Sequence, residues 1–126
     1  MAGVVFTKDG IEEVQNFIRT GSGTGPVGSF FFGEDTGSIN TSRTLDNIDT
    51  VYLQKEITWE KAGDNSKFSV GLTSLELNGS YINRGGLTNG SVSVGSLITV
   101  EESIVGSKTS SFTVEIVGEV TVTPLN

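Results

Sequence analysis

Residues 112–122 read FTVEIVGEVTV, and this segment has the clearest period in the chain. Large apolar side chains and one glycine occupy every second position, and the positions between them carry mainly Thr and Glu. Successive side chains of a β-strand point to opposite faces, so the pattern predicts a strand with one dry face and one wet face. The predicted dry series is Phe112, Val114, Ile116, Gly118, Val120 and Val122.

A second two-residue period starts at residue 50. One face is predicted to carry Val51, Leu53, Ile57 and Trp59, and the opposite face Tyr52, Gln54, Glu56 and Thr58. Residues 62–66 (AGDNS) predict a turn, and a returning strand follows with inward Phe68, Val70 and Leu72. The two strands therefore form a hairpin. Leu75 and Leu77 fall on the other parity, which predicts a bulge near Thr73 and Ser74.

The remaining strands are less regular. Residues 27–32 are mostly apolar and predict a buried strand, and a long connection follows from which Leu45 and Ile48 reach the core. The pairs Asn78-Gly79 and Asn89-Gly90 predict turns. Between them, residues 81–87 predict a short strand in which Gly85-Gly86 marks a bulge or a close backbone approach. Residues 92–100 predict another strand region, interrupted at Gly95.

One segment has a helical period. Within residues 9–21 the apolar side chains form one face of a 3.6-residue helix and are Ile11, Val14, Phe17 and Ile18. Asp9 is the predicted N-cap, with Glu12 in the capping-box position. Gly21 can adopt the left-handed conformation that ends a helix. The sequence therefore predicts a short N-terminal α-helix over residues 9–21.

These elements predict the fold class. One helix followed by about six strands joined through short turns favours an all-β fold, mainly an antiparallel β-sandwich, with one short N-terminal α-helix. The chain of 126 residues suits a single domain. We expect residues 1–8 to form an N-terminal arm and residues 9–126 to form the β-sandwich domain, which includes the helix.

Composition excludes several classes of site. The chain contains no Cys and no His, which removes disulfides, thiolate zinc sites, Cys nucleophiles and His-based triads. Fifteen acidic residues against eight basic ones give a net charge of −7, so we expect no nucleic-acid partner. Neither a signal peptide nor a membrane span is predicted, so we expect a soluble protein without a membrane partner.

The motifs of catalysis and cofactor binding also fail. Residues 23–28 (GTGPVG) match G-x-G-x-x-G in letters, but the helix precedes and the strand follows, the reverse of the dinucleotide motif. The acidic pairs Glu34-Asp35 and Glu101-Glu102 are interpreted as solvated acids, and residues 46–49 (DNID) are only a weak calcium pattern. A Ser or Thr nucleophile has no base nearby. We therefore expect no enzyme activity, no cofactor and no metal.

The aromatic residues Trp59, Tyr52 and Tyr81 allow two interpretations. Aromatic faces suit sugar rings, so together they would form a carbohydrate-binding platform. The parity of Trp59 with Val51 and Leu53 instead favours a place in the core. The core interpretation is the preferred one.

Residues 76–87 (ELNGSYINRGGL) and 108–116 (KTSSFTVEI) carry a resemblance to a known family. From about Glu13 to Val122 the order of features resembles small tail-associated structural proteins, of the baseplate and tail-fibre type, from tailed bacterial and archaeal viruses. The family commonly has an acidic residue where Arg84 stands, so the charge at that place differs here. The resemblance implies a virion structural protein located in the virion, which assembles with other virion proteins and often as a homo-oligomer.

Three functions remain open at this stage. The first is a tail, baseplate or fibre component that acts through protein–protein assembly. The second is a capsid decoration or turret protein, and the third is a receptor- or glycan-binding module at an exposed tip. For assembly, the candidate contacts are Val4, Val5 and Phe6, apolar residues near a terminus that need a partner or a sheet edge for burial. An edge strand of the protein's own sheet is an equally good place for them.

Overall fold

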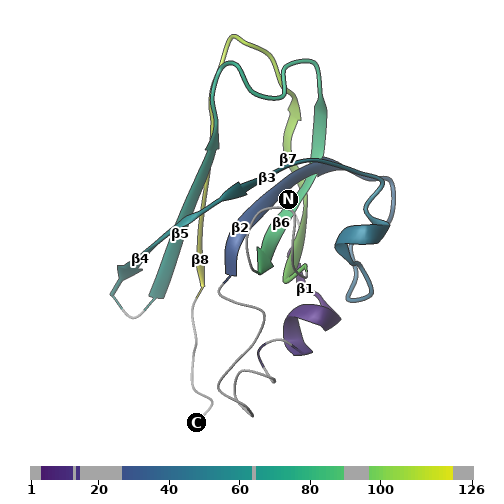
Figure 1. The fold of residues 1–126 in the computed structure, drawn as a ribbon, viewed down its shortest axis with the longest axis vertical. Helices are drawn as coiled ribbons and strands as arrows, with labels where there is room; N and C mark the ends of the chain where they lie inside the picture. Colours follow the sequence, from purple (N-terminus) through teal and green to yellow (C-terminus); the bar gives the residue numbers. More distant parts are fainter. Residues whose placement is uncertain (1–3, 13, 15–26, 64, 90–96, 121–126) are drawn as a thin grey trace.

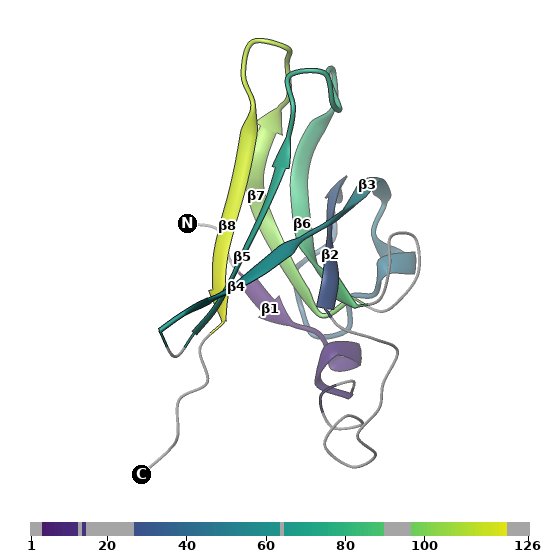
Figure 2. The ribbon, with the colours of Figure 1, turned by 60° about the vertical axis from the view of Figure 1, so that its left-hand side comes forward.

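The computed structural model describes residues 4–12, 14, 27–63, 65–89 and 97–120, and within them eight strands form two antiparallel sheets (Figures 1 and 2). In sheet order, the five-stranded sheet contains β1 (Val4–Phe6), β7 (Thr99–Ser107), β6 (Tyr81–Asn89), β2 (Val27–Glu34) and β3 (Thr50–Glu56). The three-stranded sheet contains β4 (Thr58–Ala62), β5 (Asn65–Leu72) and β8 (Val114–Val120). The predicted all-β fold with mainly antiparallel sheets is confirmed.

A first core fills the space between the two sheets. Its buried side chains come from β2, β5, β6 and the residue before β7, and they are Phe30, Phe32, Phe68, Val70, Leu72, Ile82, Leu87 and Ile98. Val114 and Ile116 of β8 pack against this cluster. The burial of residues 27–32 and the inward series of β5 are therefore as predicted.

A second core lies on the other face of the five-stranded sheet. Phe31 alternates with its two phenylalanine neighbours and packs with Ile48, Leu97 and Val100. Ile39 and Leu45 cover them from the connection between β2 and β3, which contains the short 3-10 helix η1 (Leu45–Asn47). The prediction that Leu45 and Ile48 reach the core is confirmed, and the connection acts as a second layer over this sheet.

The strand predicted from Val51 to Trp59 changes sheets halfway. β3 pairs with β2, whereas β4 pairs with β5 in the expected hairpin. Ile57 lies between β3 and β4, and its amide donates to the Gly28 carbonyl at 3.1 Å. The predicted single inward face is therefore wrong in part. Val51 packs in the second core, and both Tyr52 and Leu53 pack against the first. The strand rotates as it passes from one layer to the other, so a single parity does not hold.

The predicted bulge near Thr73 and Ser74 is also wrong. β5 ends at Leu72, and residues 73–80 form a loop that carries the chain from one sheet to the other. Leu75 is 86% exposed at its apex, while Leu77 packs against the first core with a positive φ of 56°. The phase shift therefore marks a change of layer. The turn at Asn78-Gly79 is confirmed, and the Asn89-Gly90 turn lies outside the described residues beyond Asn89.

β8 follows its predicted alternation from Val114 to Glu119, and the Val120 side chain and Val122 lie outside the described residues. Glu115, Val117 and Glu119 are exposed, while Val114 and Ile116 are half-buried against the core. A Cβ atom at position 118 would come within 2.5 Å of the Phe68 ring, so the glycine in the inner series makes room for that ring. Phe112 departs from the prediction, because it precedes the strand and is 39% exposed.

The N-terminal segment differs from the predicted order, because β1 precedes the helix and pairs with β7. Helical residues are Lys8 to Glu12 and Val14, and the predicted end at Gly21 lies outside the described residues. Asp9 is not the N-cap. The Thr7 hydroxyl accepts a hydrogen bond from the Gly10 amide at 3.0 Å, which makes Thr7 the cap, two residues before the predicted one.

The close backbone approach predicted at Gly85-Gly86 is confirmed. A Cβ atom on Gly86 would clash with the Thr99 carbonyl of β7 and would lie 3.2 Å from the Phe31 ring. The glycine therefore leaves room for the Phe31 ring beside β6 in the second core.

Candidate functional site

The predicted assembly contacts lie in β1, at one edge of the five-stranded sheet. Val4 pairs with Glu101 and Val5 with Val100, and the half-buried Val5 side chain packs in the second core. Phe6 is 46% exposed. The side chain of Val4 lies outside the described part of the structure. The edge-strand interpretation of these residues is therefore the one that the structure adopts, and Phe6 is left facing outward.

In the described part of the helix that follows, the apolar side chains are exposed and Gly10 lies against the main chain of Ile98. Thr7 is fully buried and donates through its hydroxyl to the Ile98 carbonyl at 3.2 Å, and a Cβ atom on Gly10 would lie 2.6 Å from that oxygen. Ile11 and Val14 are 44% and 50% exposed. We refer to Phe6, Ile11 and Val14 as the N-terminal apolar group. Surface helices normally bury such side chains, so this orientation suits a contact with another molecule.

Two loops form the opposite end of the molecule, which we call the tip (residues 73–80 and 108–113; top of Figures 1 and 2). They are joined by main-chain hydrogen bonds, from the Gly79 amide to the Lys108 carbonyl and from the Lys108 amide to the Ser80 carbonyl, each 2.9 Å. The fully buried Lys108 ammonium donates to Asn78 Oδ1 and the Thr109 carbonyl, and lies 5.5 Å from the Phe112 ring centre.

A second lysine also contacts the tip, at the loop formed by residues 73–80. Lys55 of β3 donates through Nζ to Glu76 Oε1 at 2.8 Å and to the Gly71 carbonyl at 2.7 Å. The hydrogen bond from Lys55, followed by the one from the Thr73 amide, lowers the pKa of Glu76. These contacts tie the loop to β3 and β5, and Leu75 is exposed at its apex. The two segments that carry the family resemblance meet at this tip.

The connection between β2 and β3 covers a buried charge cluster that the sequence patterns do not predict. Asp35 is 1% exposed, and its carboxylate accepts from Arg43 Nη2 and, at 3.2 Å, from the Asp49 amide. Arg84 Nε lies 3.7 Å from the same carboxylate, and Arg84 Nη2 donates to the Gly37 carbonyl. The interpretation of Asp35 as a solvated acid is therefore wrong.

The Asn83 amide completes this cluster. It exchanges two hydrogen bonds with the main chain of Asp35, at 2.9 and 3.0 Å. The Asp49 carboxylate accepts hydrogen bonds from the amide and the hydroxyl of Thr36. The hydrogen bond from the Thr36 amide is the main reason that the pKa of Asp49 is lowered. The cluster fixes the connection over the second core. A weak signal for it was available, because Arg43 and Arg84 are the only arginines besides Arg19.

Three further acidic residues, Glu34, Glu101 and Glu102, have surroundings that differ from those of Asp35. Glu34 accepts from the Tyr52 hydroxyl at 2.7 Å, a bond that raises the pKa of Tyr52. Glu102 lies 3.9 Å from Arg84 Nη1, and burial raises the pKa of its neighbour Glu101. Within the described residues, no three His, Cys, Asp or Glu side chains are placed to hold a metal ion.

The three candidate aromatic residues have different surroundings. Trp59 donates to the Val27 carbonyl at 2.6 Å and packs edge-on against Phe68, with ring centres 5.4 Å apart, so it lies against the core as preferred. The Tyr52 hydroxyl is engaged by Glu34. Tyr81 is half-exposed where β6 begins. No platform is formed from the three together.

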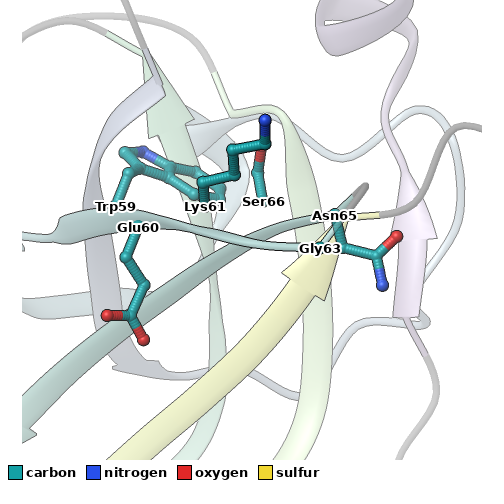
Figure 3. Close-up of a pocket in the computed structure, with 6 residues that line it drawn as sticks. All are labelled: Trp59, Glu60, Lys61, Gly63, Asn65 and Ser66. Atoms are coloured by element: carbon teal, nitrogen blue, oxygen red, sulfur yellow. The ribbon is translucent and has the colours of Figure 1, made fainter.

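An open depression of about 410 Å³ lies beside Trp59, on the β4–β5 hairpin (Figure 3). Lys61 and Ser66 lie on the same side of the hairpin as the indole, whereas Glu60 points the other way. Asn65 and Gly63 form its outer end. The depression brings together one cation, one hydroxyl and an indole edge, without a titratable pair suited to acid–base chemistry.

Comparison with known proteins gives no relative. No family model matches the chain, and neither the curated proteins nor the solved structures contain a significant match. In the part of the chain that the structure describes, no helix has the length and apolar character needed to span a membrane.

Proposed function

We propose that this protein is a structural subunit of a virus particle, a tail, baseplate or fibre component that acts by assembly with other virion proteins and with copies of itself. It performs no catalysis in this role. The observation that carries the proposal is the N-terminal apolar group, whose side chains face outward from an anchored edge of the sandwich.

The anchoring is what makes this group suitable for assembly. β1 is paired along its length with β7, and Thr7 ties the start of the helix to the residue before β7. The Lys8 amide also donates to the Thr41 carbonyl of the β2–β3 connection at 2.8 Å. A partner that covers Phe6, Ile11 and Val14 therefore meets a preformed surface and orders little chain on binding, which favours affinity.

The resemblance to small tail-associated proteins supports the same function independently of the geometry. It rests on residues 76–87 and 108–116, which form the tip and the strands that leave it. Apolar side chains are thus exposed near the tip as well, with Leu75 and Phe112 as examples. A subunit with contact surfaces at both ends suits a stacked assembly.

The test is the combined variant Phe6→Ser, Ile11→Ser and Val14→Ser, compared with Val117→Ser as a matched control on an exposed valine. We expect the wild-type chain and the control to have an oligomeric mass by analytical ultracentrifugation, and the triple variant to have the mass of one chain. Melting temperatures should agree, because all four side chains are exposed. Deletion of residues 1–8 is a weaker test, since it removes β1 from the sheet.

Two further measurements separate the alternative functions. Antibodies against the purified chain should label the tail of the virus particle; label on the capsid would instead favour a decoration or turret protein, and unlabelled particles would refute a virion role. A glycan-array signal lost in Tyr81→Ala would favour a receptor-binding tip, because Tyr81 is half-exposed beside it. Tyr52→Ala is less informative, as its hydroxyl bonds to Glu34.

A further inference from the structure

β8 is an edge strand with one side unpaired in the described structure. It forms the end of the three-stranded sheet and pairs with β5 over Val114 to Val120 (Figures 1 and 2). No described strand pairs with its other side. An unpaired edge presents a row of N–H and C=O groups that can accept a further strand.

β8 is also the most regular of the long edges. Its register with β5 is continuous over seven residue pairs, whereas β3, the edge of the other sheet, pairs with β2 through a shift at Phe32/Gly33. β3 additionally carries Lys55, whose ammonium reaches across to Gly71 and Glu76. A lysine of this kind protects an edge from strand addition. β8 has no basic residue.

The side chains of β8 define what could pair with it. Its outer face carries Glu115, Val117 and Glu119, all exposed, with Val117 at 48%. On the β5 side Glu119 lies opposite Lys67, but Glu115 lies opposite Gly71, which offers no side chain. A strand added at the free edge would therefore best place a basic, an apolar and a second basic side chain against these three positions.

A second copy of this chain does not meet that requirement. Antiparallel pairing of two β8 strands about Val117 would place Glu115 opposite Glu119 of the other copy, and like charges directly opposite are destabilising. No other segment of this chain meets the requirement either. The pattern needs two basic residues four positions apart, and no two of the eight Lys and Arg residues have that spacing.

We propose that the free edge of β8 binds an extended segment of another protein with the pattern basic–x–apolar–x–basic, by addition of a strand to the sheet. The main-chain hydrogen bonds supply affinity, and Glu115, Val117 and Glu119 select the sequence. This surface is separate from the N-terminal apolar group, so the proposal does not depend on the function proposed above.

The probe is a capped peptide, Thr-Lys-Thr-Val-Thr-Lys-Thr, titrated to millimolar concentration into the labelled full-length chain and followed by two-dimensional NMR. We expect the shifts to be largest along β8 and its amides to become protected from exchange. A peptide with Glu in place of Lys should not bind. The two edges of the peptide can be tested separately by N-methylation of every second amide. Binding should be lost only when the methylated edge is the one that pairs with β8.

The protein variants separate strand addition from general attraction to an acidic protein. Glu115→Lys with Glu119→Lys should weaken binding of the Lys peptide by about tenfold or more, since two cross-strand pairs are reversed. Glu56→Lys with Glu60→Lys, which changes the net charge by the same amount on exposed acids of β3 and β4, should leave it nearly unchanged. Absence of binding, shifts centred elsewhere, or equal weakening by both variants would overturn the proposal.

Discussion

β2 and β8 have similar lengths, eight and seven residues, and each pairs with antiparallel neighbours in its own sheet, but their faces are covered differently. β2 lies inside the five-stranded sheet, with the first core on one face and the second core on the other. β8 lies at a sheet edge, with the core on one face and exposed side chains on the other. The difference appears directly in the sequence, as three consecutive phenylalanines in β2 and as alternation in β8.

The comparison shows that the two sheets of a small sandwich can be covered unequally. The five-stranded sheet is packed on both faces, by the three-stranded sheet and by a third layer, whereas the three-stranded sheet is packed on its inner face. The third layer is the connection between β2 and β3, which has little regular structure of its own and is fixed by the Asp35 cluster. Coverage of β2 by the third layer therefore depends on a few polar contacts, whereas β8 depends on its pairing with β5 and on the packing of Val114 and Ile116 against the first core. Substitutions on the two strands should reveal this asymmetry.

The largest effect is expected for Phe31→Ala in the second core. The ring is fully buried among Ile48, Leu97 and Val100, so its removal should leave a cavity and lower the free energy of unfolding by about 3–5 kcal/mol. Chemical denaturation measures this loss. The control is Val117→Ala on β8, which should change stability by less than about 0.5 kcal/mol. Equal losses for the two variants would mean that the second core adds no stability.

The next effect concerns the polar contacts that hold the third layer. Asp35→Asn keeps the shape of the side chain but leaves Arg43 and Arg84 without their buried anion, which should cost about 3 kcal/mol. Hydrogen exchange should also become faster at the Asp49 amide. Asp46→Asn, on an exposed acid in the same connection, should have little effect. If Asp35→Asn were as mild as this control, the cluster would not be what fixes the connection.

This asymmetry also explains what could be predicted from the sequence. The alternation of β8 and the burial of residues 27–32 depend on local patterns, and both are confirmed. The change of sheet at Ile57 and the loop at residues 73–80 depend on where the second layer lies, which a local period does not contain. The local period predicts one continuous strand through Ile57 and a bulged strand at Thr73 and Ser74, and the errors in parity and in the bulge result from this.

The Asp35 cluster was missed for a related reason. Asp35 and Arg84 are brought together because Gly33 pairs with Arg84 across β2 and β6, and this register depends on the whole sheet. Of the candidate assembly residues, Phe6 is exposed and Val5 is half-buried. Ile11 and Val14 share the predicted apolar face of the helix, but the helical period alone does not tell whether the protein itself covers this face.

A pair of glycine substitutions sharpens the comparison at closer range. Gly86→Ala would drive a methyl group into the Thr99 carbonyl of the neighbouring strand, whereas Gly118→Ala would press on the Phe68 ring of the first core. A side-chain ring can shift, but the main chain of a paired strand cannot do so easily. We expect losses of about 3 kcal/mol and about 1 kcal/mol, respectively, by denaturation. The reverse order would place the more rigid packing at β8.

The smallest effect is expected at Glu101, in β7 beside β1. Burial raises the pKa of its carboxyl above the ordinary value of 4.5, so the folded state holds this proton more tightly than the unfolded state does. Its contribution to stability is therefore full below that value and falls as the pH rises through the folded-state pKa. Glu101→Gln should accordingly stabilise the protein slightly at neutral pH and change little at pH values below 4.5, as measured by thermal melting.

Glu76→Gln provides the control of opposite sign. The hydrogen bond from Lys55 lowers the pKa of Glu76, so the stability that its carboxylate provides is present at neutral pH and is lost as the pH falls through the folded-state pKa. Glu76→Gln should therefore destabilise the protein at neutral pH and converge with the wild type in acid. If both variants shifted melting in the same direction at neutral pH, net charge rather than local burial and bonding would govern the response. In that case the tip and the β1 edge would not differ electrostatically as the contacts of Lys55 and the burial of Glu101 imply.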